Sequence, residues 1–161
     1  MEFAFVQFRK GDNLNMRSGT VLLGAVLLCV ASAMPGCSQK QPAPLWAGIS
    51  VDRPVFHEDT CRDMQLHFTV INQSSETIDP QIVKSMLYVN GEKLEASQQI
   101  FSNAPRYDCF KAVKPGECME FAYYLGQYFD KPGIYQVAWK GDGFETQPVL
   151  FRVEPKDSRA Q

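Results

Sequence analysis

The sequence has few of the residues and motifs that enzymes use for catalysis. Only two of its 161 residues are histidines, and no nucleophile elbow, glycine-rich phosphate loop or carboxylate pair stands out. Nucleophilic catalysis needs a base beside a serine or cysteine, and two histidines leave little from which to assemble one. The composition therefore favours a binding protein over an enzyme, and it implies no metal or cofactor.

Charge runs and long apolar runs are also missing. The 16 basic and 18 acidic residues give a formal net charge of −2 and are spread along the chain, so nucleic acid is not an expected partner. The longest apolar run covers the 14 residues of 20–33, whereas a helix that crosses a bilayer needs roughly 20. The shorter length is typical of the apolar core of a secretory signal peptide.

Basic residues, this apolar run and a following cysteine together predict a signal peptide over residues 1–36. Translation starts at Met1 or at Met16, since both methionines precede the apolar run. Met34-Pro35-Gly36-Cys37 follows the run directly. This sequence resembles the lipobox of bacterial lipoproteins, in which a small residue precedes the cysteine that becomes lipidated.

The lipobox resemblance implies that Cys37 carries the lipid and that residues 37–45 tether a domain to a membrane. It places the protein in the cell envelope with its domain outside the cytoplasm. The expected partner there is an envelope protein or a polymer. Plain secretion is the alternative, because Ala31-Ser32-Ala33 also fits the small-residue pattern that ordinary signal peptidase cleaves.

Residues 46–155 alternate between apolar and polar side chains over short segments separated by turn residues. The alternation is clearest over 64–71, and Asn90-Gly91 is a strong signal for a tight hairpin turn. No window keeps an apolar period of 3.6 residues, so 96–113 is interpreted as a connector. About seven short antiparallel strands at regular spacing predict an all-β, two-sheet sandwich, followed by a polar tail at 156–161.

The segment from Asp130 to Val137 reads Asp-Lys-Pro-Gly-Ile-Tyr-Gln-Val. It resembles the tyrosine corner of the immunoglobulin-like superfamily, which includes fibronectin-like domains. The resemblance implies an immunoglobulin-like sandwich, with Tyr135 largely buried and its hydroxyl bonded to the backbone just upstream. Val137 stands where antibody domains carry a bridging cysteine, so their inter-sheet disulfide is not implied. The resemblance concerns the fold alone, because this fold hosts many functions.

Three cysteines remain once one leaves with the signal peptide and Cys37 takes the lipid. A hairpin around residues 114–117 would make Cys109 and Cys118 diagonal neighbours on adjacent strands. Closing a disulfide between them would need a small bulge. The sequence therefore predicts a Cys109–Cys118 bridge and a free thiol at Cys61.

The connector 96–113 carries the candidates for partner contact, Arg106 and Tyr107, which are residue types enriched at binding hot spots. The alternative is that the connector forms an irregular edge strand whose aromatic residues, Phe101, Tyr107 and Phe110, complete the core.

The sequence as a whole predicts a membrane-anchored lipoprotein that acts as a non-catalytic binding module. A β-sandwich protease inhibitor is a second possibility of the same class. The rival class is a metal-binding or enzymatic protein using residues 57–61, which combine histidine, glutamate, aspartate and cysteine. Their spacing matches no recurrent ligand pattern.

Overall fold

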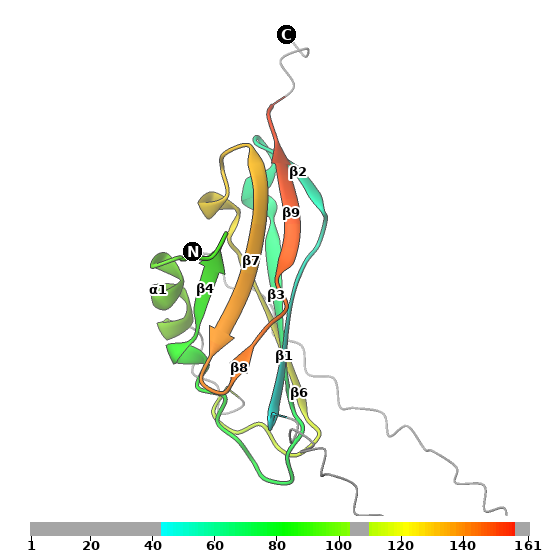
Figure 1. Ribbon diagram of the computed structural model, residues 1–161, viewed down its shortest axis with the longest axis vertical. Helices are drawn as coiled ribbons and strands as arrows, with labels where there is room; N and C mark the ends of the chain where they lie inside the picture. Colours follow the sequence, from blue (N-terminus) through cyan, green and yellow to red (C-terminus); the bar gives the residue numbers. More distant parts are fainter. Residues whose placement is uncertain (1–42, 104–109, 157–161) are drawn as a thin grey trace, which may run out of the picture. The chain divides into compact units, whose positions relative to one another are not determined.

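Two β-sheets pack face to face in the computed structural model, which describes residues 43–103 and 110–156 (Figure 1). One sheet has three strands in the order β1-β3-β6. The other has six, in the order β2-β9-β7-β4-β5 with β8 paired to β7. The strands are β1 (Leu45–Val51), β2 (Val55–His57), β3 (Gln65–Asn72), β4 (Met86–Val89), β5 (Glu92–Lys93), β6 (Cys118–Tyr124), β7 (Gly133–Gly141), β8 (Phe144–Glu145) and β9 (Val149–Glu154).

The predicted two-sheet architecture is confirmed, although the strand number and pairing differ in detail. The described residues form nine strands, and three of the nine are only two or three residues long. Among the short ones, β2 pairs with β9 in parallel, with Phe56 opposite Val153, so the sheets are not purely antiparallel. Only Phe56 of β2 is buried. A segment of this length cannot display the alternation that identifies a strand in a sequence.

Period-two alternation in the sequence corresponds directly to the core. Leu66, Phe68 and Val70 of β3 are buried, while the residues between them are half-exposed, as the alternation predicts. Phe68 packs edge-on against Trp139 of the facing sheet, with ring centroids 5.1 Å apart. Aromatic side chains from the inner faces of the two sheets thus pack on each other in the core.

The hairpin predicted at Asn90-Gly91 is confirmed. Both residues have positive φ, 51° and 86°. A two-residue hairpin turn of this type needs positive φ at both positions, and Asn-Gly supplies it at low cost. The turn sets the predicted register, since the Leu94 amide donates to the Leu87 carbonyl oxygen over 2.9 Å.

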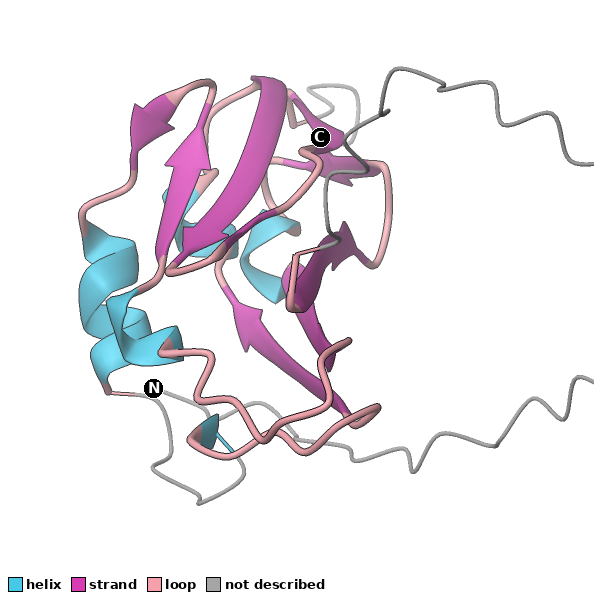
Figure 2. Cartoon of the chain, turned by 60° about the horizontal axis from the view of Figure 1, so that its bottom comes forward, coloured by secondary structure: helices cyan, strands magenta, loops and turns pink. Residues whose placement is uncertain are grey.

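A helix in the connector is the main departure from the sequence prediction. Residues Ala96–Ser102 form α1, which lies at the edge of the six-stranded sheet beside β4 (Figures 1 and 2). The hydroxyl of Ser97 accepts a hydrogen bond from the Leu87 amide (3.0 Å) and donates one to the Leu94 carbonyl (2.6 Å). Short helices owe their stability to tertiary packing. α1 has only seven residues, of which Ser97 and Phe101 are buried. A segment this short does not show the 3.6-residue apolar period by which a helix is recognised in a sequence.

Phe101 and Phe110 are 0% and 6% exposed, so the alternative reading of the connector aromatics as core residues is confirmed for both. Further turns of 3-10 helix are η1 (Cys61–Asp63), η2 (Ile82–Lys84) and η4 (Gly126–Tyr128).

The hairpin expected around residues 114–117 does not form as predicted. β6 pairs with β3, with Cys118 opposite Ile71, and Val113 instead forms an isolated bridge with Ile78. The turn residues are present, but the chain before the turn runs to a different neighbour. A local turn signal cannot specify which distant strand a segment will join.

The hydrogen bond expected from the hydroxyl of Tyr135 to the backbone just upstream is present. The hydroxyl of Tyr135 donates to the carbonyl oxygen of Lys131 over 2.7 Å, and its ring stacks on Phe151 with centroids 5.4 Å apart. Tyr135 is half-buried, less than the resemblance implies, because it lies near the start of β7 at one end of the sheet. This partial burial is the main cause that raises the pKa of its hydroxyl.

Tyr135→Phe tests the contribution of this hydrogen bond. We expect a loss of about 0.5–1.5 kcal/mol in the free energy of unfolding, the net value of one ordinary hydrogen bond, because water can reach the exposed carbonyl of Lys131. Urea titration should show a lower midpoint at an unchanged slope. Tyr124→Phe, an exposed tyrosine on the other sheet, is the control. An unaltered midpoint for Tyr135→Phe would mean that the corner does not stabilise the fold.

Candidate functional site

Four of the residues singled out from the sequence lie outside the described residues. They are the lipidation candidate Cys37, the contact candidates Arg106 and Tyr107, and the disulfide candidate Cys109. Those assignments stay predictions.

Two free cysteines lie in the described part of the chain. Cys61 is buried, and its thiol donates to the Glu58 carbonyl oxygen over 3.2 Å. Burial, and next the charge of Asp130, raises the pKa of Cys61. Cys118 is half-buried, and desolvation followed by the charge of Glu120 raises its pKa. Both thiols therefore stay protonated near neutral pH, which makes them poor nucleophiles.

The hairpin on which the pairing of Cys109 with Cys118 was based is wrong, but the pairing itself stays a prediction because Cys109 lies outside the described residues. Cys118 lies at the start of β6, opposite Ile71 of β3, and has no disulfide partner within the described part of the chain.

The side chains of residues 57–61 diverge. His57 is exposed, with Nδ1 4.0 Å from the carboxylate of Glu154, whereas the thiol of Cys61 points into the core. Within residues 43–103 and 110–156, no three histidine, cysteine, aspartate or glutamate side chains are grouped to hold a metal ion. Sequence proximity brings these groups together along the chain, but the turn into η1 separates them in space. The rival metal or enzymatic reading gains no support from this geometry.

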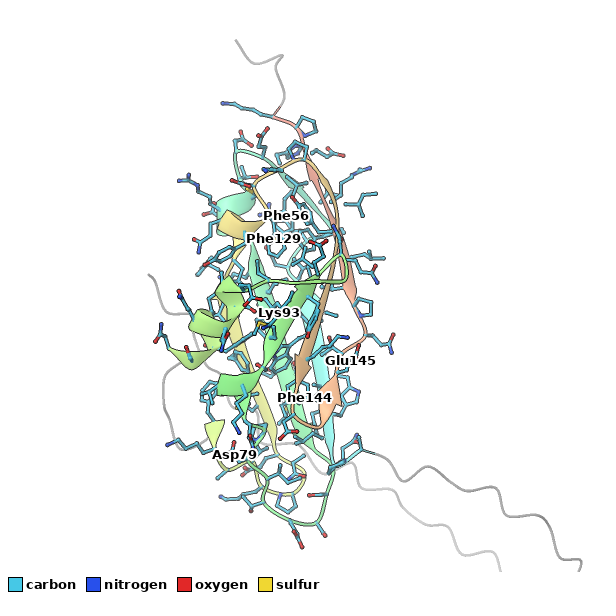
Figure 3. The ribbon with its side chains drawn as sticks, turned by 60° about the vertical axis from the view of Figure 1, so that its left-hand side comes forward. Phe56, Asp79, Lys93, Phe129, Phe144 and Glu145 are labelled. Carbon is cyan, nitrogen blue, oxygen red and sulfur yellow. The ribbon has the colours of Figure 1, made fainter. Side chains whose placement is uncertain are left out.

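A small cavity of about 300 Å³ lies by η1 and η4 and is lined by Arg62, Gln127 and Asp130. All three side chains are exposed and can form hydrogen bonds, but none is a nucleophile. Next to Gln127 in η4, Gly126 packs directly on the backbone of Cys61. Figure 3 labels Phe56 and Phe129, whose rings both pack on Phe151 in the core.

The outer face of the six-stranded sheet carries three exposed aliphatic side chains, Val55, Ile134 and Leu150. Val55 and Ile134 lie on either side of Arg152, which forms an ion pair of 2.6 Å with Glu154. The charged pair interrupts the aliphatic surface, and exposed aliphatic residues of this number are normal on proteins.

The outer face of the three-stranded sheet is the best candidate for a binding surface, and we call it the open face. It is formed by the side chains that alternate with the buried ones, namely Trp46, Gly48 and Ser50 of β1, Gln65, His67, Thr69 and Ile71 of β3, and Cys118, Glu120, Ala122 and Tyr124 of β6. Two of its members are exposed aromatic residues, Trp46 at 47% and Tyr124 at 42%. Trp46 is in register with Cys118 of β6 through Ile71 of β3. Tyr124 lies six residues further along β6, which corresponds to about 20 Å along the strand.

The indole of Trp46 folds back over Gly48 of its own strand. A methyl group added at Gly48 would lie 2.7 Å from Trp46 Cη2 and 3.1 Å from Cζ3. The outer edge of the six-membered ring therefore occupies the space above the backbone of Gly48 that a side chain would fill at any other residue. Nearly half of the surface of Trp46 remains open to a ligand.

Ile71 lies directly across from Trp46, and polar side chains lie in the next row, in register with the glycine that the indole covers. Thr69 lies directly across from Gly48, and Glu120 lies across from Thr69. The next row along the sheet pairs Ser50 with His67. The open face therefore combines an aromatic ring with hydroxyl, carboxylate and imidazole groups on rigid strands, an arrangement suited to hydrogen-bonding a polar ligand.

From the sequence, Trp46 was identified only as the first residue of the domain and not as a candidate for ligand contact. The available signal was the spacing Trp46-Ala47-Gly48 in an alternating strand, which puts the indole and the glycine on the same face. Whether that face is covered by another layer depends on the fold and is not encoded in the alternation.

A scan against protein-family models, a search of curated proteins and a search of solved structures each returned no match. No helix among the described residues has the length and apolar character needed to cross a membrane.

Proposed function

We propose that the chain is a membrane-anchored bacterial lipoprotein whose β-sandwich binds an extracytoplasmic partner and catalyses no reaction. The observation that carries the binding role is the open face. Its exposed ring at Trp46 lies beside Thr69 and Glu120, on strands that hold the side chains in fixed register. Conformational order of this kind lowers the entropy that a surface loses when it binds.

The anchor is supported by the sequence at residues 34–37 and by where the chain enters the domain. Pro44 accepts a hydrogen bond from the Gln73 amide over 2.9 Å, so the chain joins the sandwich at the end of β3. The predicted tether ended at residue 45, but Leu45 is the buried first residue of β1, so the tether ends at residue 44. Residues 38–44 would reach roughly 22 Å in an extended, proline-containing form. The tether therefore keeps the entry end, with Trp46 beside it, close to the membrane.

An immunoglobulin-like topology is part of this proposal. The order β1-β3-β6 corresponds to strands A, B and E, and the order β9-β7-β4-β5 to strands G, F, C and C′. The tyrosine-corner bond from Tyr135 to Lys131 also supports the assignment. Two features depart from the family pattern. Helix α1 stands between β5 and β6, where the family has strand D, and the buried Trp139 is on β7 instead of strand C.

A non-catalytic role is supported by the chemistry of the reactive groups. The thiols of Cys61 and Cys118 have raised pKa values. His57 and His67 lie on different sheets. The open face supports a general binding module, and nothing in the described part of the chain specifically favours the protease-inhibitor alternative.

Cys37→Ser tests the anchor. We expect the variant to move from the membrane fraction to the soluble fraction, because the thioether that attaches the diacylglycerol can no longer form. Immunoblotting of separated fractions, together with incorporation of labelled fatty acid, measures the change. Cys29→Ser is the matched control, since it changes a cysteine inside the signal peptide and should leave anchoring intact. A Cys37→Ser protein that stays fatty-acid labelled would contradict the proposal.

A further inference from the structure

We infer that the open face binds carbohydrate, with Trp46 as the stacking platform for one sugar ring. This inference rests on the proposed binding function and specifies its ligand class. It comes from the position of the indole over Gly48 and from the groups that adjoin it.

The orientation of the indole suits a sugar. The face of an aromatic ring carries negative charge density and attracts C–H groups that bear slight positive charge. A pyranose ring presents such C–H groups on its own flat face. Because Trp46 lies against Gly48 with 47% of its surface exposed, it offers its ring face without further rearrangement.

The polar residues of the open face suit the hydroxyl groups at the rim of a sugar. Neighbouring strands place directly opposed Cβ atoms about 5 Å apart, so Thr69 and Glu120 lie one and two strands away from the platform. A carboxylate accepts hydrogen bonds from two hydroxyls and forms stronger bonds than a neutral acceptor does. Ser50 and His67 extend the same surface along the strands.

A membrane is the other partner that an exposed tryptophan could contact, and the geometry disfavours it. Trp46 folds back over Gly48, whereas insertion into a bilayer requires a side chain that projects beyond its surroundings. Glu120 is two strands away and would lose hydration if this face entered the apolar region. A tether of the proposed length leaves room for the open face to lie outside the bilayer, where an envelope polysaccharide can contact it.

The chain offers a direct optical test because it has only two tryptophans. Trp139 is fully buried and Trp46 is exposed, so a surface ligand should alter the emission of Trp46 alone. The probes are trisaccharides of β-1,4-linked N-acetylglucosamine, β-1,4-linked glucose and α-1,4-linked glucose, added to the purified mature protein in detergent. We expect at least one of them to give a saturable change in emission.

Variants then assign the signal. Trp46→Ala should weaken binding, followed by calorimetry, about tenfold or more, the loss typical of removing one stacked aromatic ring. Gly48→Ala should also weaken it, since the new methyl group displaces the indole. Leu150→Ala, on the outer face of the six-stranded sheet, is the control and should bind as wild type does. Unchanged circular dichroism would show that all three variants are folded.

Three results would overturn the inference. The first is that none of the trisaccharides changes the emission, and the second is that Trp46→Ala binds sugar as tightly as wild type does. The third is that brominated lipids in phosphatidylethanolamine–phosphatidylglycerol vesicles quench Trp46 while no sugar changes its emission. The last result would assign the face to the membrane. Fractionation of Cys37→Ser is a separate measurement, so failure of the anchor and failure of sugar binding are distinguishable.

Discussion

Gly126→Ala is expected to destabilise the domain by about 4 kcal/mol or more, beyond the usual cost of overpacking. A Cβ at this position would lie 1.6 Å from the carbonyl oxygen of Cys61 and 2.5 Å from its carbonyl carbon. Neither side can easily move away. The Cys61 carbonyl accepts a hydrogen bond from the Met64 amide, and the Gly126 carbonyl accepts one from the Phe129 amide. Chemical denaturation followed by circular dichroism measures the loss.

Gly133→Ala is the matched control for this experiment. Gly133 begins β7, is exposed, and a Cβ there would meet nothing within 4 Å. We expect its free energy of unfolding to stay within about 0.5 kcal/mol of wild type. Equal effects of the two alanine variants would show that the close approach of η4 to η1 is not a constraint on the fold.

Trp139→Ala is the second substitution with a large expected effect, about 3–5 kcal/mol. Trp139 is fully buried, and its Nε1–H donates to the hydroxyl of Ser85 over 2.8 Å. Removing the indole leaves a cavity between the sheets. It also removes a packing partner of Phe68 and of Phe144, whose ring centroids lie 5.1 and 4.6 Å from that of the indole. A small domain has only about 5–15 kcal/mol of stability in total, so partial unfolding at 37 °C is expected.

Trp46→Ala provides the comparison, because Trp46 is the other tryptophan and lies on the surface. Its loss should change the denaturation midpoint far less than the loss of Trp139. If the two variants lost the same free energy of unfolding, the assignment of Trp139 to the core would be contradicted.

Local signals predicted what depends on local structure. The alternation of Leu66, Phe68 and Val70 specified a half-buried strand, and Asn90-Gly91 specified both a turn and its register. In each case a few neighbouring residues contain the whole physical requirement, either one apolar face or two positive φ angles.

Features that depend on distant partners were not predictable in this way. The parallel pairing of β2, the pairing of β6 with β3 and the packing of Phe101 of α1 on Phe68 and Trp139 all involve residues far apart in the chain. The open face was missed for the same reason. Alternation shows that Trp46 and Gly48 share one side of a strand, but the packing of the sheets decides that no other described layer covers this side.

The most direct test of the proposed function is mass spectrometry of the N-terminal peptide from the native membrane fraction. We expect a peptide that begins at Cys37 and carries a thioether-linked diacylglycerol and an acylated amine. An unmodified peptide that begins at Met34 would show cleavage by ordinary signal peptidase, and it would contradict a membrane-anchored lipoprotein.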